Sequence, residues 1–458
     1  MTEATGRKAS PTVTLDPLAP LVVIATATML ALVVFTAPLT TLEAMTDALA
    51  LSAGEQAWTM SGMPLGAAAG LLFAGALGDT TGRRRTLLGG LWLTALSSAL
   101  AALAWSGPVL IAARILQGLG SAGIMACGLG IVGTVYRGAA QRRAAGIWAA
   151  ALGAGVAVGP ILASLMLGLA GWAAIHWVLA IFAAGLAVVG VVHLPESPRA
   201  RARVDVAGGL LLMIAMGCAL GAMTELRVGS PVRVAILAAL AAVALLIFLT
   251  VERRSGNPVL QIGLFLRPDF AGATLAALAS GAGVLALMSL VPTVLVRGFG
   301  VGPLSAAVIL LAWSGLTVVA ALYTGWLPER LSSRDRVVIA LLGCMVGQLL
   351  LWGAHEGATW RIVLPGLLVA GISNGILNAA LGHAAVQSVP SERSAMGSAA
   401  NNTARYLGSA MGIAVISLLI AAPGPSGFFT GWHRAVALSA LVSLGGAIAV
   451  LALSRRHA

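Results

Sequence analysis

The sequence predicts an all-α polytopic membrane protein, and three observations carry this prediction. Of its 458 residues, 59% are hydrophobic and only 9% are charged, whereas roughly a quarter of the residues of a soluble domain are charged. The apolar residues form runs of about 20, the length that crosses a bilayer as a helix. The basic residues gather in alternate loops, the pattern that orients a membrane protein.

The runs, separated by charges, prolines and glycines, predict fourteen transmembrane spans. The first run is longer than the roughly 7–15 apolar residues of a signal peptide, so we expect an uncleaved first span. An even number of spans places both termini on the same side. In chain order, the spans are 18–38, 58–77, 87–105, 108–135, 144–168, 172–193, 206–224, 233–251, 270–296, 304–327, 337–354, 361–382, 396–421 and 433–453.

The basic residues predict the orientation. With a cytoplasmic N-terminus, 20 of the 27 Lys and Arg lie in cytoplasmic segments, and only Arg114 and Arg405 lie within spans. Lys8 is the only lysine, and this bias, with the Ala and Gly excess, indicates a bacterial source. We expect a multi-pass protein of the bacterial inner membrane with both termini cytoplasmic. Its net charge of +12 then indicates anionic lipid head groups as partners, and no nucleic acid.

One polar loop, GALGDTTGRRR (75–85), separates two apolar runs. Gly75 and Gly78 would let helix backbones approach closely. Asp79 places a negative charge at the membrane edge, where Arg137 or the positive N-terminus of the span that starts near Ala395 could hold it. An ion pair that forms in one conformation and breaks in another is what a gate needs. A plain positive-inside turn is the alternative.

A degraded repeat of this loop, GWLPERLSSR (325–334), follows the tenth span and indicates two related halves. Within the spans, Arg114 is an intramembrane cation and therefore a functional candidate. Its alternative role is a hydrogen-bond anchor to neighbouring carbonyls. Gly155, Gly159 and Pro160 would bend the fifth span and pack it closely.

These motifs resemble the major facilitator superfamily. The loop is similar to its signature G-x-x-x-D-x-x-G-R-R/K-R/K, RILQGLGSA (114–122) to its fourth-helix motif, and GAGVAVGPILAS (153–164) to the fifth-helix motif of its exporters. NNTARYLGSAMGIAV (401–415) is similar to the fourteen-span drug:proton antiporter subfamily.

The resemblance implies a major facilitator fold: two six-helix bundles, at 18–193 and 270–454, with a cytoplasmic tail at 1–17 and two inserted spans in a linker at 194–269. It also implies a gating loop and a substrate cavity between the bundles, lined by spans 1, 4, 9 and 12. The gating candidates are Gly75, Gly78, Asp79, Gly82, Arg83, Arg84 and Arg137.

The polar candidates for the cavity include span 13, and interhelical hydrogen bonding is the alternative role for each of them. They are Thr26, Thr36, Gln117, Asn374, Asn378, Asn401, Asn402 and Arg405.

The chain departs from that subfamily at one position. Val34 or Phe35 stands where the subfamily carries an aspartate in the first span, and the predicted spans hold no deep Asp or Glu. The resemblance ties Arg114 to proton coupling. A proton carrier must then be Asp79, a histidine or an end-of-span carboxylate such as Glu43. The missing carboxylate favours a neutral or anionic substrate over a lipophilic cation.

The leading prediction is a monomeric secondary exporter of a small amphipathic drug, antibiotic or metabolite that works by alternating access. The proton gradient is its expected energy source. The alternatives are an uncoupled facilitator, a dedicated exporter of one neutral or anionic metabolite, and a membrane sensor or enzyme. The sequence carries no G-x-x-x-x-G-K-[ST] motif and no Ser/His/Asp or metal-ligand cluster. We therefore expect no enzyme activity, cofactor or metal.

Overall fold

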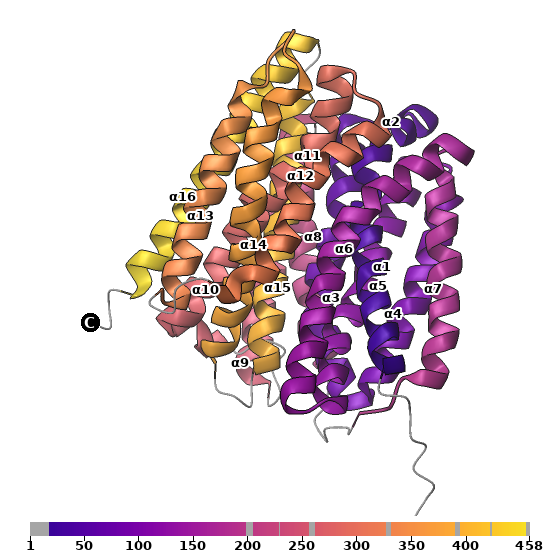
Figure 1. Cartoon of the computed structure of the whole chain (residues 1–458), viewed down its shortest axis with the longest axis vertical. Coiled ribbons are helices and arrows are strands. Elements are labelled where there is room, and N and C mark those ends of the chain that lie inside the picture. Colours follow the sequence, from indigo (N-terminus) through magenta and orange to yellow (C-terminus); the bar gives the residue numbers. More distant parts are fainter. Residues whose placement is uncertain are drawn as a thin grey trace, which may run out of the picture.

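The computed structural model describes residues 18–197, 205–228, 230–255, 262–326, 331–389, 394–421 and 424–454. Within these ranges the chain is helical and contains no strand (Figure 1). The all-α prediction is therefore confirmed.

The N-terminal helices form one side of the molecule, drawn in indigo to magenta (Figure 1). Pro38 opens a second helix directly after the first, and Ser52 caps the third through a capping box with Glu55. These helices are α1 (Leu18–Thr36), α2 (Pro38–Leu49), α3 (Ala53–Thr81), α4 (Arg83–Ala102), α5 (Gly107–Val135), α6 (Gly138–Ala170) and α7 (Ala173–His193).

The C-terminal helices form the other side, drawn in orange to yellow (Figure 1). The predicted span 270–296 is a continuous helical rod that alternates α- and π-helical turns. The elements are η1 (Ile262–Leu266), α10 (Pro268–Ala279), η2 (Ser280–Leu285), α11 (Ala286–Thr293), η3 (Val294–Gly298), α12 (Pro303–Leu322), η4 (Tyr323–Trp326), α13 (Ser333–Leu350), η5 (Leu351–Gly353), η6 (Trp360–Val363), α14 (Leu364–Gln387), α15 (Ser394–Ile420) and α16 (Pro425–Ser454).

Two further helices, α8 (Val206–Val228) and α9 (Pro231–Arg254), lie between these groups in the chain. Helix α8 packs against α3 and α15, and α9 packs against α8. Much of α9 is exposed although it is apolar; Val232 and Leu246, for example, are both more than 60% exposed. Such a surface suits contact with lipid.

Thirteen helices of the described ranges are long and apolar enough to cross a membrane. Helix α4, which corresponds to the predicted span 87–105, is not among them, and it begins with three arginines. The count of fourteen spans and the domain boundaries therefore stay predictions. The first span also differs from its prediction, because the helical path continues beyond residue 38 to Leu49 through α2.

The two groups of helices meet along α3 and α15, along α6 and α12, and where α2 lies beside α11 and α12. We call the end where α3 joins α4 the arginine-rich end, because Arg83, Arg84 and Arg85 lie there. The opposite end, where α2 joins α3, is called the distal end.

Candidate functional site

The polar loop at the arginine-rich end turns at Gly82, which joins α3 to α4. Its φ of +114° lies in the region that favours glycine. A Cβ atom at this position would also collide with the carboxylate of Glu196. Both the backbone conformation and the close approach favour glycine here, and the gating role of Gly82 stays a prediction.

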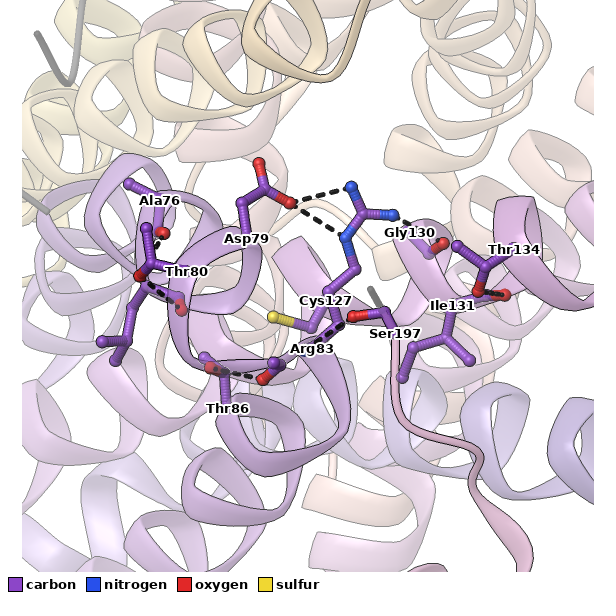
Figure 2. Close-up of polar contacts among 12 residues, drawn as sticks. Ala76, Asp79, Thr80, Arg83, Thr86, Cys127, Gly130, Ile131, Thr134 and Ser197 are labelled. Atoms are coloured by element: carbon purple, nitrogen blue, oxygen red, sulfur yellow. Dashed lines mark hydrogen bonds and ion pairs between the residues drawn. The ribbon is translucent and has the colours of Figure 1, made fainter. Parts of the chain in front are cut away.

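Asp79 is held by Arg83 of the same loop (Figure 2). Arg83 Nε and Nη2 donate to Asp79 Oδ1 at 3.0 and 2.8 Å, and Nη1 donates to the carbonyl oxygen of Gly130 on α5 at 2.8 Å. The expectation that Arg137 holds Asp79 is wrong in this structure: Arg137 is exposed ahead of α6. Asp79 lies in the last turn of α3 and Arg83 opens α4, so the turn at Gly82 brings their side chains together.

The other expected partner of Asp79 is the N-terminus of the span near Ala395. Helix α15 begins at Ser394, next to residues 390–393, which lie outside the described residues. That pairing therefore stays a prediction.

Two residues that follow α7 complete the loop. The backbone N–H of Arg83 donates to Ser197 Oγ at 3.1 Å, as Figure 2 shows, and that of Arg84 donates to Glu196 Oε1 at 3.2 Å. Arg85 Nε lies 3.7 Å from Glu196 Oε2. These contacts satisfy orphan N–H groups at the start of α4, where the helix dipole also favours a carboxylate. Sequence reasoning missed both residues, although Glu196 is an acid in an arginine-rich loop.

The two glycines of α3 differ in their surroundings. A Cβ atom at Gly78 would lie 2.6 Å from Cys127 Sγ on α5, so the expected close approach is confirmed there. A Cβ atom at Gly75 would meet open space. The expectation of close packing at Gly75 is wrong, because this face of α3 has no neighbour within contact distance.

Arg114 is fully buried and serves as a hydrogen-bond anchor. Its Nε donates to Thr59 O at 3.2 Å, Nη1 to Val34 O at 2.7 Å, and Nη2 to Phe35 O at 3.3 Å. The carbonyl of Val34 would bond the N–H of residue 38 in a continuous helix, but proline has none. Arg114 therefore supplies the donor that Pro38 removes.

Gln117 is also buried and extends this network. Its Oε1 accepts from Arg114 Nη1 at 2.7 Å, and its Nε2 donates to Ser98 Oγ on α4 at 3.0 Å. In this structure Gln117 therefore forms an interhelical hydrogen bond and does not face an open cavity.

The glycines of α6 provide the close packing that its motif predicts. A Cβ atom at Gly155 would collide with the carbonyl of Met29 on α1, and one at Gly159 with the hydroxyl of Thr36. Thr36 is buried and donates to Leu32 O at 2.8 Å. Pro160 lies inside the continuous helix α6.

Pro160 also offers its carbonyl oxygen to another helix. The hydroxyl of Thr40 on α2 donates to it at 3.1 Å. This bond and the glycine contacts join α6 to the kinked path of α1 and α2.

The polar candidates on the C-terminal side fall into two sets. Arg405 Nη1 on α15 donates to Asn378 Oδ1 on α14 at 2.9 Å, and Asn374 Nδ2 donates to Thr317 Oγ1 on α12 at 3.3 Å. Asn378 and Arg405 are half-buried, and Asn374 is buried. Sequence reasoning missed Thr317, whose position next to α14 could not be read from the chain.

The remaining candidates lie apart from these sets. Asn401 Nδ2 donates to Ala273 O on α10 at 3.3 Å, and Asn402 Nδ2 donates to Ser398 O of its own helix at 3.1 Å. Thr26 is half-buried on α1. For Asn401, interhelical bonding is the role that the geometry favours.

At the distal end, one ion pair joins the two sides of the molecule. Glu43 Oε1 on α2 lies 3.6 Å from Arg297 Nε at the end of the α10–η3 rod. The Arg297 guanidinium also lies 5.2 Å from the centre of the Phe428 ring on α16. Burial raises the pKa of Glu43 above its ordinary value, although Arg297 acts in the opposite direction. Sequence reasoning named Glu43 but missed Arg297.

Comparison with known proteins agrees with this architecture. The family model of the Major Facilitator Superfamily matches residues 24–413. The multidrug resistance protein Stp of Mycobacterium tuberculosis is 30% identical over 80% of this chain and 68% of its own length.

Two further relatives are export proteins. The multidrug efflux pump LfrA of Mycolicibacterium smegmatis is 30% identical over 88% of this chain and 81% of its own length. The tetracenomycin C resistance and export protein of Streptomyces glaucescens is 26% identical over 84% of this chain and 72% of its own length. With its many membrane-spanning helices, the chain is a multi-pass membrane transporter rather than an enzyme, and it belongs to the major facilitator superfamily.

Proposed function

We propose that this protein exports small amphipathic drugs, antibiotics or metabolites across the bacterial inner membrane by alternating access, in exchange for protons. The names of its relatives, which include multidrug efflux and antibiotic export proteins, support drug export. The arginine-rich end faces the cytoplasm in this proposal, both termini are cytoplasmic, and the working unit is a monomer.

The ion pair between Glu43 and Arg297 is the observation that carries the mechanism. It links helices of the two sides at the distal end. At the arginine-rich end, the bonds of Asp79 in the described residues stay within the N-terminal side. An ion pair thus joins the two sides at the distal end, whereas the gating carboxylate Asp79 does not join them at the arginine-rich end. This asymmetry is what alternating access requires of a state that is open to one side.

Glu43 is the proton-coupling candidate that this geometry favours. Its raised pKa makes protonation easier, and a neutral Glu43 no longer attracts the Arg297 cation. Proton uptake would therefore release the distal end. Arg114 is less suited, because its donors are already committed to three backbone carbonyls and Gln117.

An uncoupled facilitator is the second candidate. It is favoured by the absence of a carboxylate near the middle of any described span, where the buried cation is Arg114. A facilitator would move substrate down its own gradient with no proton in exchange.

The test uses the purified full-length protein in proteoliposomes that contain a pH-sensitive dye. Ethidium, chloramphenicol and fusidate are supplied under an imposed pH gradient to the wild type, Asp79→Asn, Glu43→Gln and Asp47→Asn. Asp47 lies on α2 like Glu43 but is exposed; because its charge raises the pKa of Glu43, Asp47→Asn should shift the pH dependence of proton movement while leaving the movement itself intact, and it serves as the matched control.

Proton movement that depends on substrate in the wild type and Asp47→Asn, and that is lost in Glu43→Gln, supports the antiporter. Substrate movement without protons leaves the facilitator. If none of the three compounds moves faster than in empty liposomes, drug export itself is rejected.

A further inference from the structure

Arg114 and Arg405, which lie away from the ends of their membrane-spanning helices, are in opposite states. Arg114 is fully buried and makes four side-chain hydrogen bonds, to three carbonyls and Gln117. Arg405 makes one, to Asn378, and its Nε is buried without a hydrogen-bond partner. Among the residues that the structure describes, no carboxylate forms an ion pair with Arg405.

Arg405 lies near the middle of its helix and near the junction of the two sides. It is the twelfth of the 27 residues of α15, so it lies roughly 18 Å from the start of that helix. The next residue, Tyr406, contacts the N-terminal side: its hydroxyl donates to Met125 Sδ on α5 at 3.5 Å, and its ring packs against that of Phe35 at 6.3 Å.

A guanidinium in this position is costly unless an acceptor satisfies it. Charged groups in the membrane interior normally pair with one another or with carbonyls, as Arg114 does. The planar guanidinium presents paired N–H groups that match a carboxylate. Arg405 is half-buried rather than enclosed, so part of its side chain stays open to a ligand, although its Nε is buried. Its guanidinium also lies 5.6 Å from the centre of the Tyr406 ring, an apolar and aromatic neighbour.

We infer that Arg405, together with Asn378, binds the carboxylate of an amphipathic organic anion, so that this transporter takes organic acids in preference to their neutral or cationic analogues. The inference rests on the proposed export function and adds its substrate class. Arg405 supplies the charge, and Asn378 orients the guanidinium through its amide oxygen.

The test measures ligand-induced stabilisation of the full-length protein in lipid nanodiscs, followed by tryptophan fluorescence during heating. The probes are fusidic acid and naphthaleneacetic acid, each compared with its own methyl ester, and ethidium. The variants are Arg405→Gln, Arg405→Lys and, as a control that removes one exposed arginine far along the chain, Arg361→Gln.

We expect both acids to bind about 10- to 100-fold more tightly than their esters, the range for a charge-assisted hydrogen bond. Arg405→Gln should abolish this preference, Arg405→Lys should retain part of it, and Arg361→Gln should leave it unchanged. Because each acid is compared with its ester in one variant, a general loss of stability cannot imitate the result.

Equal binding of acids and esters by the wild type, a preference that survives in Arg405→Gln, or the absence of acid binding would each overturn the inference. A separate measurement keeps the proposed function distinct. If pump-deficient cells that express the protein accumulate less ethidium or chloramphenicol than control cells, export stands even when the preference for acids fails. If they accumulate the same amounts of these compounds and of fusidate, export itself fails.

Discussion

Replacing Arg114 with glutamine separates a structural role of this residue from a role in proton coupling. The shorter amide cannot reach Thr59, Val34 and Phe35 together, so three carbonyls of α1 and α3 lose their donor. The carbonyl of Val34 has no substitute, because Pro38 cannot provide an N–H in its place.

The expected loss of stability follows from these bonds. A buried carbonyl left without a donor costs about 1–3 kcal/mol. Because the groups left behind are neutral and the carbonyl of Val34 is the one without another donor, we expect a total loss of about 3 kcal/mol. Arg405→Gln removes only the hydrogen bond to Asn378, at a position that is half-buried. We therefore expect it to cost less than about 1.5 kcal/mol.

The assay compares the apparent melting temperatures of the wild type, Arg114→Gln and Arg405→Gln in the same detergent. We expect Arg114→Gln to melt about 5 °C or more below the wild type and Arg405→Gln to remain within roughly 3 °C of it. A melting temperature of Arg114→Gln equal to that of the wild type, with transport lost, would refute the anchoring role and return Arg114 to proton coupling.

Three further predictions concern the two ends of the molecule. Gly82→Ala should lower the free energy of unfolding by about 1–3 kcal/mol, because alanine there has a strained φ and contacts the Glu196 carboxylate. In the same thermal melt, Gly75→Ala should be neutral or slightly stabilising, because its Cβ atom would lie in open space. The distance between spin labels on α2 and α12 should lengthen as pH falls through the raised pKa of Glu43, since its ion pair with Arg297 exists only above that pKa. In Glu43→Gln the same distance should not respond to pH, and a response that persists in this variant would contradict the assignment. Glu196→Gln should cost about 1 kcal/mol through loss of charge at the start of α4, an effect that high salt should reduce and that a salt-independent melt would disprove.

Much of the fold and part of the candidate site could be predicted from the sequence. The apolar runs are long and local, so helix positions follow from composition alone. The gating loop is also a local motif, but its internal pairing was not predicted: Asp79 is held by Arg83, across the break at Gly82, rather than by Arg137. The prediction also failed where partners are distant in sequence. Glu196 is 112 residues from Arg84, and Arg297 is more than 250 residues from Glu43.

The two glycines of α3 show the same limit. Gly75 and Gly78 lie three residues apart in one motif. One faces Cys127 of α5 and the other faces open space. Only the packing of the neighbouring helix distinguishes them, and a single sequence does not contain that information.

The hydrogen bonds between Arg83 and Asp79 affect the energy barrier between the open and closed states of the arginine-rich end. Both bonds from the guanidinium go to Oδ1, and Oδ2 makes no hydrogen bond within the described ranges. A second partner could therefore approach Oδ2 without displacing Arg83. Under the proposed function, the arginine-rich end would shut by adding a bond instead of exchanging one. Closing this end would then not require the Asp79–Arg83 ion pair to break, whereas reopening it would require the added bond to Oδ2 to break.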